Sequence, residues 1–310
     1  RRSIDARRKA DILAVYIVDV EVKDEAAVLG RLAKDANVSQ SPRAEYQMPE
    51  RVRGDGGGGV VVVGSGPCGL MAALVLAQSG YRPVVIERGK EVIARAKDVR
   101  QFWQSGKLDP ESNVQFGEGG AGTFSDGKLT TQIKDKSNRT RKVLEEFVKA
   151  GSPEEILQQG RPHIGTDNLV RMVKNIRQTI ISLGGQVRFE TKLTGIRIKD
   201  GRVTAAVVNG SDEIEANTIV LATGHSSRDV FEMLDGLGVP MEAKAFSIGV
   251  RIEHPQSLVD TSQFGKFAGH KMLGAADYKL VHHCRSGRSA YTFCMCPGGE
   301  VIAASSELGG

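Results

Sequence analysis

The sequence predicts an α/β fold built on a parallel β-sheet. Two strands lead to this prediction: a run of four valines at residues 60–63 and a second apolar strand at residues 83–86. Between them lie a glycine-rich turn and an apolar stretch long enough for a helix. Since a strand, a helix and a further strand in this order form a βαβ unit, we expect the two strands to lie parallel in one sheet.

The turn after the first strand carries Gly64, Gly66 and Gly69 in the spacing G-x-G-x-x-G. The first glycine permits a tight turn, the second lets the backbone approach a pyrophosphate, and the third allows the helix to pack closely on the strand. The helix at residues 70–78 then directs its N-terminal amides toward the phosphates. We therefore predict that the whole turn contacts a dinucleotide, through Gly64, Ser65, Gly66, Pro67, Cys68 and Gly69.

An acidic residue, Glu87, follows the second strand directly. In units of this type a carboxylate at this place accepts hydrogen bonds from the ribose hydroxyls of adenosine and repels a 2′-phosphate. Glu87 and its neighbour Arg88 are thus predicted to lie at the adenosine. Nicotinamide and flavin dinucleotides both contain that adenosine, so this unit alone leaves the choice between them open.

Residues 113–131 form a second glycine-rich segment. Its glycines give the backbone amides freedom to wrap around an anion or a flat ring. The segment also contains the hydrogen-bonding side chains of Asn113, Thr123, Ser125 and Lys128. A flexible loop is the alternative, but this combination favours a cofactor contact.

The following segment predicts a helix start at Ser152-Pro153-Glu154-Glu155, which has the pattern of a capping box. A longer helix begins near Asp167, and short strands follow at residues 187–190, 193–198, 203–208 and 213–222. The last strand ends at Thr223-Gly224, where the backbone again approaches a site without an obstructing side chain. A domain that binds only a nicotinamide dinucleotide has no evident need of this second approach of the backbone to the site.

The chain divides at residues 49–59, which have the composition of a Gly/Pro linker. Residues 1–48 predict a small α+β module, with a strand at residues 11–22 and a helix at residues 24–35. Residues 60–240 predict the dinucleotide-binding domain. Residues 241–310 predict part of an antiparallel β domain, including a hairpin of residues 278–284 and 289–296.

The composition limits the function further. At 310 residues, with 40% hydrophobic and 25% charged residues, the chain is long enough for two substantial domains. Its longest apolar run, residues 70–77, is shorter than the ~20 residues that span a bilayer, so no membrane span is predicted. The net charge of +5 is modest, and no basic stripe interleaved with aromatic residues extends beyond the N-terminal end, so no nucleic-acid partner is predicted.

The chain contains four cysteines, too few and too unevenly placed for a disulfide framework. This favours a reducing compartment and predicts a cytoplasmic location. An organelle such as the plastid is the alternative, because the chain begins with Arg1 instead of methionine.

The G-x-G-x-x-G turn, Glu87-Arg88-Gly89 and the strand ending at Ala222-Thr223-Gly224 together resemble the glutathione-reductase type of flavoprotein, which has two dinucleotide-binding domains. Longer stretches look like a family of largely uncharacterised FAD-dependent dehydrogenases with a small N-terminal module. They include SIDARRKADI, ESNVQFGEGGAGTFSDGKLTTQIKDK, RPHIGTDNLV, FSIGVRIEHPQ, LGAADYKL and YTFCMCPGG. This likeness covers nearly the whole chain.

The resemblance implies an α/β fold with a Rossmann-like FAD-binding domain, an inserted antiparallel β substrate domain and a small α+β N-terminal module. It implies non-covalent FAD, with NADH or NADPH as the candidate electron donor and a small molecule as the substrate. Carried over by position, the first turn meets the pyrophosphate, Glu87 the adenosine ribose and Leu193 the adenine. The residues implied to contact the flavin side are Gly120, Ala121, Gly122 and Thr123. Those implied to contact the cofactor backbone are Ala222, Thr223 and Gly224.

Flavoproteins of this type also have a late Gly-Asp segment that grips the ribityl chain and closes the FAD site. This chain ends at Gly309-Gly310 without one. We therefore expect a C-terminally truncated chain.

No catalytic acid or base is identified by the sequence, and no metal site is predicted. Cys294 and Cys296 share one face of the predicted hairpin, with Cys284 across from them. Buried structural thiols are the favoured interpretation, and a thiol relay to a flavin and a metal site are the alternatives. His225 either approaches the cofactor or caps the next helix.

The predicted function is hydride transfer through a bound flavin, for which the protein supplies position, electrostatics and exclusion of water. Two alternatives stay open: a flavin-binding module without turnover, and an NAD-dependent dehydrogenase, which leaves Thr223-Gly224 unexplained. The substrate and the oligomeric state have no signal in the sequence.

Overall fold

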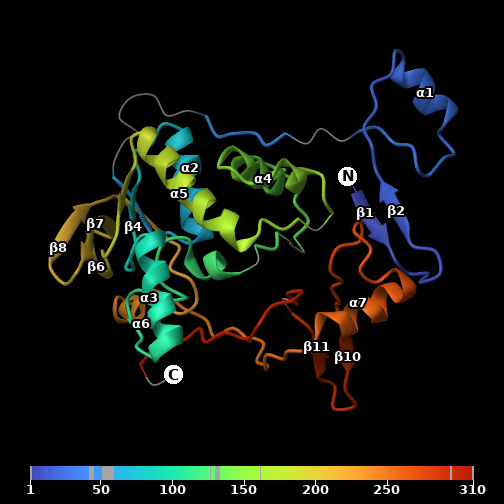
Figure 1. Cartoon of the computed structure of the whole chain (residues 1–310). Helices are drawn as coiled ribbons and strands as arrows, with labels where there is room; N and C mark the ends of the chain where they lie inside the picture. Colours follow the sequence, from blue (N-terminus) through green and yellow to red (C-terminus); the bar gives the residue numbers. More distant parts are fainter. Residues whose placement is uncertain are drawn as a thin grey trace.

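A computed structural model of the chain describes residues 2–41, 45–50, 59–125, 127–129, 133–160, 162–293 and 295–308. Most of the linker predicted at residues 49–59 lies outside these ranges, as does Cys294. Figure 1 shows one lobe around the sheet strand β4 and a second, smaller lobe that contains the N-terminal strands and the hairpin β10–β11.

The centre of the fold is a four-stranded parallel sheet with the strand order β5-β4-β3-β9. Its strands are β3 (Val60–Val63), β4 (Val84–Ile86), β5 (Gln186–Arg188) and β9 (Thr218–Leu221). β3 pairs with β4 on one side and with β9 on the other. The predicted parallel βαβ unit is confirmed, and the ends of β4 and β9 flank the glycine-rich turn.

Both faces of this sheet are buried. Helices α2 (Pro67–Gln78), α4 (Arg139–Lys149) and α5 (Thr166–Ser182) cover one face, where Val62 and Val85 join their core. Figure 1 shows α2 and α5 side by side. Val61 and Val63 point to the other face, into a core that includes residues of a second sheet and of α6 (Arg228–Gly236). Alternate valines thus serve opposite faces, as expected for a doubly covered strand.

The second sheet is antiparallel and contains β6 (Leu193–Lys199), β7 (Arg202–Val208) and β8 (Asp212–Glu215). The single strand predicted at residues 213–222 is wrong, because the structure divides it between the two sheets. Ala216 N donates to Thr204 O, whereas Asn217 N donates to Gly59 O. The chain therefore crosses from one sheet to the other between β8 and β9.

The predictions did not include the helices α3 (Val92–Ser105) and α4, nor α7 (Gln256–Phe264) further along the chain. The capping box at residues 152–155 is also wrong. A single 3₁₀ turn, η2 (Glu154–Leu157), follows Pro153, with no side-chain cap. The hydroxyl of Ser152 contacts the sulfur of Met172 at 3.3 Å instead, so this hydroxyl does not cap the turn. A further 3₁₀ turn, η1 (Gly120–Phe124), lies in the second glycine-rich segment.

The N-terminal module consists of an antiparallel pair, β1 (Arg2–Asp5) and β2 (Leu13–Tyr16), and the helix α1 (Glu25–Arg31). The predicted helix is confirmed, and the carboxylate of Asp24 caps it by accepting from Ala27 N. The predicted strand at residues 11–22 is too long. It ends at Tyr16, and Val18 and Val20 are 70% and 73% exposed.

The predicted antiparallel domain at residues 241–310 forms only in part. The described residues there contain α7 (Gln256–Phe264), the 3₁₀ turn η3 (Gly265–Phe267) and the short hairpin β10 (Val281–His283) and β11 (Ser289–Tyr291). The predicted hairpin is confirmed, but it is shorter than expected. α7 shares a small core with the N-terminal module, and Figure 1 shows it beside β1 and β2.

Residues 246–252 have the alternation of a strand but belong to no strand in the described chain. Phe246, Ile248 and Val250 are 87–94% exposed. The intervening Arg251 donates to Ile302 O. The apolar side chains at these positions thus point to solvent.

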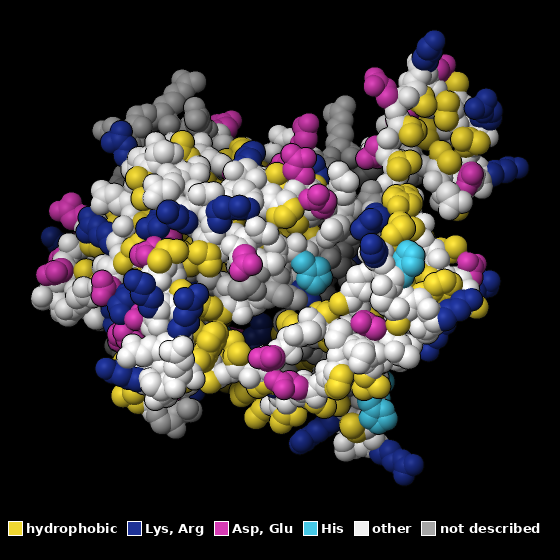
Figure 2. All heavy atoms as spheres, in the orientation of Figure 1, with side chains coloured by type: hydrophobic (Ala, Val, Ile, Leu, Met, Phe, Trp, Pro, Cys, Tyr) yellow, Lys and Arg dark blue, Asp and Glu magenta, His cyan; other side chains and the backbone are white. Residues whose placement is uncertain are grey.

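Hydrophobic side chains are also exposed over the N-terminal module, as the upper right of Figure 2 shows. No helix in the described ranges has both the length and the hydrophobicity needed to cross a membrane.

Candidate functional site

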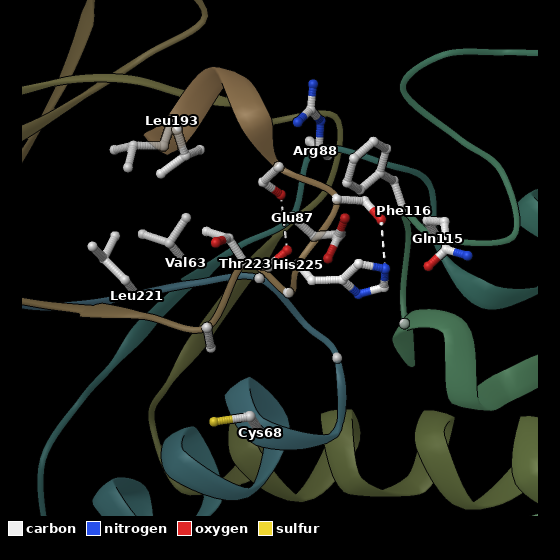
Figure 3. Close-up of a pocket in the computed structure, with 18 of the residues that line it drawn as sticks. Val63, Cys68, Glu87, Arg88, Gln115, Phe116, Leu193, Leu221, Thr223 and His225 are labelled. Atoms are coloured by element: carbon white, nitrogen blue, oxygen red, sulfur yellow. Dashed lines mark hydrogen bonds between the residues drawn. The ribbon is translucent and has the colours of Figure 1, made fainter. Parts of the chain in front are cut away.

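A pocket of about 520 Å³ opens at the carboxyl ends of β3, β4 and β9. This is the place where open α/β sheets bind ligands, because the chain leaves the central strand toward opposite sides. Figure 3 shows Val63, Leu193 and Leu221 on one side of the pocket and Gln115 and Phe116 on the other.

Most residues predicted to bind the cofactor line this pocket. They are Gly64, Gly66, Pro67, Cys68, Glu87, Arg88, Gly120, Ala121, Gly122, Leu193, Ala222, Thr223 and Gly224. The structure therefore brings together the first turn, the acidic end of β4, the second glycine-rich segment and the end of β9.

Three predicted residues support the pocket without lining it. Ser65 is fully buried and donates two hydrogen bonds to Glu87. Gly69 lies under the turn, where the helix packs on the strand. Thr123 belongs to the second segment but its side chain is buried, and its hydroxyl donates to Glu118 O at 3.3 Å.

The three glycines of the turn differ in what surrounds them. Gly64 has φ 100°, and a Cβ there would lie 2.5 Å from Ala222 O. A Cβ on Gly69 would lie 1.8 Å from Gly64 O. A Cβ on Gly66 would meet only Gly120 Cα, at an ordinary 3.8 Å. The fold itself therefore requires Gly64 and Gly69, whereas Gly66 lines an open pocket.

This pattern fits a pyrophosphate. Gly66 is also the N-cap of α2, and no side chain caps that helix end. Amides at a helix N-terminus and the dipole behind them favour an anion in front of them. The close approach of such an anion would account for the glycine at position 66, which the contacts within the described protein do not require.

Glu87 is only 5% exposed, and its carboxylate is engaged by the protein. One oxygen accepts from Ser65 N and Ser65 Oγ, both at 2.8 Å. The other accepts from Gly89 N and Gly117 N, both at 3.0 Å. A carboxylate has about four acceptor positions. A ribose hydroxyl would therefore have to share or replace one of these donors, and the Ser65 hydroxyl is the one that can rotate away.

Four charged residues form a ring at one side of the pocket. Arg88 pairs with Glu111 at 2.6 Å and Asp229 at 3.0 Å, and Lys192 pairs with the same two carboxylates at 3.0 and 2.8 Å. Burial alone lowers the pKa of Arg88, but the hydrogen bonds of these carboxylates outweigh it and raise that pKa. The Arg88 guanidinium also lies 4.2 Å from the centre of the Phe116 ring.

Two buried charged residues lie at the second glycine-rich segment, with Arg95 behind it and Glu118 within it. Arg95 in α3 is fully buried, and burial lowers its pKa to about 10, which leaves it protonated at neutral pH. Glu118 is also fully buried, and burial raises its pKa. Arg177 pairs with Glu118 at 2.9 Å. The sequence predictions missed both Arg95 and Glu118, because a single charge in a polar stretch is usually solvated.

Helix α6 contributes a further wall that the sequence did not predict, through Val230, Phe231 and Leu234. The available signal was the start of a helix soon after Thr223-Gly224. His225 lines the pocket, in agreement with the first of its two predicted roles.

The cysteines are spread over the structure. Cys68 is exposed at the start of α2 and lines the pocket. Cys284 is half-buried and Cys296 is exposed, so the predicted burial of these thiols is wrong for Cys296. In the described part of the chain, no group of three or more His, Cys, Asp or Glu residues could hold a metal ion.

Two family models match this chain. Residues 58–258 match the family of pyridine nucleotide-disulphide oxidoreductases, and residues 245–310 match the C-terminal domain-like family of FAD-dependent proteins. A protein of Clostridium beijerinckii described as an uncharacterized protein is 50% identical over 310 residues, which are all of this chain and 57% of that protein.

Two more distant likenesses cover part of the chain. An L-aspartate oxidase of Saccharolobus solfataricus is 23% identical over 211 residues, which are 60% of this chain and 42% of that protein. The crystal structure of Thermovibrio ammonificans THI4 is 20% identical with a TM-score of 0.39, over 59% of this chain and 64% of that one. This chain spans little more than half the length of the Clostridium relative described above. By the match over most of its length, the chain belongs to the pyridine nucleotide-disulphide oxidoreductase family, among FAD-dependent oxidoreductases.

Proposed function

We propose that this protein holds FAD non-covalently in the pocket and passes hydride between NADH or NADPH and a small-molecule substrate through the flavin. The observation that carries the proposal is the meeting of two glycine-rich segments at Gly66 and Gly120. A Cβ on Gly120 would lie 3.1 Å from Gly66 Cα, and both residues line the pocket. A turn for pyrophosphate and a second open backbone segment beside it suit a cofactor that extends beyond the adenosine diphosphate.

In this proposal the first turn and the N-terminus of α2 bind the pyrophosphate. Arg88, Leu193 and Glu87 lie at the adenosine, where an apolar side chain and a polar rim suit a base and a ribose. Gly120, Ala121 and Gly122 extend the pocket toward the flavin side, and Thr223-Gly224 borders the cofactor backbone.

FAD supplies the hydride chemistry when it is bound. This chain's own residues bind and orient it. Arg88 stays protonated through its two carboxylate partners, and it shields one side of the pocket together with Phe116. The apolar side chains of β3, β9 and α6 exclude water on the opposite side.

The test is the chromophore of a protein that has the full length of the Clostridium relative. We expect it to purify yellow, to release FAD and not FMN on acid precipitation, and to bleach anaerobically with NADH or NADPH. The variant Gly66→Val is the control and should purify without the flavin, because its side chain enters the pocket.

The outcomes separate the parts of the proposal. A colourless protein that takes up no added FAD but binds NAD tightly would refute the flavin assignment. A yellow protein that neither nicotinamide donor reduces would refute the assignment of the donor and leave the FAD site standing.

A further inference from the structure

We infer that Arg95 is a positioning residue for the cofactor site: it holds residues 113–119 so that the adjoining Gly120, Ala121 and Gly122 line the pocket. Arg95 does not itself line the pocket. The inference rests on the proposed function, because the ligand that this segment serves is taken to be FAD.

The first observation is the set of groups that Arg95 contacts. Its guanidinium donates to three backbone carbonyls, with Nε to Asn113 O at 2.8 Å, Nη2 to Val114 O at 2.8 Å and Nη1 to Glu118 O at 2.7 Å. Arginine presents its N–H groups in a fixed planar fork. One rigid group thus fixes the distance between Asn113 and Val114 at the start of the segment and Glu118 near its end.

The second observation is how the opposite side of the segment is held. Its amides donate to the first dinucleotide unit: Gly117 N to the carboxylate of Glu87, Glu118 N to Lys90 O and Gly119 N to Ser65 O, at 2.9–3.1 Å. The amides are therefore held by the turn and the acid, while the carbonyls are held by Arg95. Without Arg95, the carbonyls of Asn113 and Val114 lose this donor, and Glu118 O keeps only the Thr123 hydroxyl at 3.3 Å.

The third observation is the close packing of the segment on the arginine. Gly117 has φ 118°, and a Cβ there would lie 2.4 Å from Cδ of Arg95. The side chain also stacks 4.8 Å from the centre of the Phe124 ring, at the end of η1. Contacts at residues 113–118 and at Phe124 thus bracket Gly120, Ala121 and Gly122 on both sides.

The test compares Arg95→Met, which keeps much of the bulk but no donor, with Arg95→Lys, which keeps the charge and one donor group. Each variant is made in a protein that has the full length of the Clostridium relative, and Ile156→Ala is the stability control. Ile156 is 1% exposed in the core beneath α2 and α5, and it does not line the pocket. The readouts are the Kd for FAD, the visible circular dichroism of bound flavin, and hydrogen exchange at the amides of residues 117–119 in the apoprotein.

We expect Arg95→Met to raise the Kd for FAD by about tenfold or more, as the loss of one charge-assisted hydrogen bond would. It should also alter the dichroism of the flavin that remains bound and speed exchange at the three amides. Arg95→Lys should lie between Arg95→Met and the wild type. Ile156→Ala should lower Tm but leave the Kd and the dichroism unchanged.

Arg95→Met with the wild-type Kd and dichroism would overturn the inference, as would an equal loss of affinity in Ile156→Ala. If Arg95→Met does not fold, Arg95→Lys decides by the same two readouts. If the wild type binds no FAD, the proposed function fails on its own. Exchange in the apoprotein then decides whether Arg95 holds the segment: faster exchange in the variants supports this role, and unchanged exchange overturns it.

Discussion

At the scale of single residues, the three turn glycines illustrate that one motif combines two different requirements. Gly64 and Gly69 are required by contacts inside the protein, and their Cβ positions would clash with backbone oxygens. Gly66 has no such contact, so in our proposal its requirement comes from the bound pyrophosphate. A substitution at each place should therefore affect a different property.

We predict that Gly66→Ala keeps the free energy of unfolding within about 0.5 kcal/mol of the wild type but lowers FAD retention. Gly69→Ala should lower the free energy of unfolding by about 2 kcal/mol or more, because its Cβ would lie 1.8 Å from Gly64 O. Urea denaturation and the flavin content after gel filtration measure the two effects. Equal losses of stability in both variants would contradict this division of roles.

Glu87 carries a second prediction at this scale. Its removal leaves the buried donors Ser65 N, Gly89 N and Gly117 N without a partner, so Glu87→Ala should lower the free energy of unfolding by about 3 kcal/mol even in apoprotein. Glu111→Ala is the control, because that side chain is 43% exposed and its loss should cost about 1 kcal/mol or less. Chemical denaturation of the apoproteins compares them, and an unchanged Glu87→Ala would show that the four hydrogen bonds do not stabilise the fold.

The sequence predicts some of these residues and not others, for a physical reason. A glycine in a turn has a local signature, because its position relative to the strand and the helix sets its role. Arg95 and Glu118 have none, since Arg95 is buried by the loop of residues 113–119, which contains Glu118 and lies further along the chain. Glu87 is an intermediate case. Its place at the site was predicted, but the four hydrogen bonds that its carboxylate accepts from the protein were not.

At the scale of elements, strands depend on partners more than helices do. The helix near Asp167 and the strand of valines follow from local periodicity, and both are confirmed. The strands predicted at residues 11–22 and 213–222 are wrong in length. Alternation of apolar and polar residues shows only that a segment can adopt the extended conformation of a strand. Which neighbour it pairs with is decided by the rest of the fold.

The ring of Arg88, Lys192, Glu111 and Asp229 joins four segments, namely the stretch just after β4, the loop after α3, the stretch just before β6 and the helix α6, and it carries a prediction of pH dependence. Burial alone raises the pKa values of Glu111 and Asp229, but their cationic partners lower both below the ordinary values. A depressed pKa in the folded state gives stability that is complete above the unfolded values, about 3.9–4.3, and is lost as the pH falls through the lower folded values.

We therefore expect the free energy of unfolding to fall more steeply below pH 4 in the wild type than in Asp229→Asn. At pH 7 the variant should be less stable by about 1 kcal/mol, a value discounted because the Asp229 side chain is 36% exposed. Urea denaturation between pH 3 and pH 7 measures the difference. Parallel curves for the two proteins would show that the ring does not couple protonation to folding.

At the scale of the whole molecule, the cores do not follow the order of the sequence. The two larger cores contain residues from Val61 to Leu234 only. The third joins α7 and its neighbours to Ala6 and Ile12 of the N-terminal module. The N-terminal module therefore packs with the C-terminal segment, which no local pattern could predict because these residues lie at opposite ends of the chain.

This division predicts that residues 59–240 fold and bind ADP by themselves. The residues that line the pocket run from Val63 to Leu234, so this piece contains the whole described pocket. Described polar contacts to the C-terminal segment are few: Trp103 donates to Ala303 O, Gln115 donates to Ala304 O at 3.4 Å, and Arg228 pairs with Glu307 at 3.3 Å with both side chains more than half exposed. Removing residues 241–310 should therefore cost little stability.

ADP is the appropriate ligand for this piece, because it contains the adenosine and the pyrophosphate but does not depend on the flavin side. We expect a single cooperative unfolding transition whose Tm rises with ADP, since a ligand that binds only the folded state stabilises it by mass action. The same piece with Gly66→Val should unfold cooperatively but show no shift, because its side chain lies where the pyrophosphate approaches. A piece that folds and shows no shift would place the dinucleotide outside this pocket, whereas a piece that does not fold would show that the smaller lobe is needed for the larger cores to form.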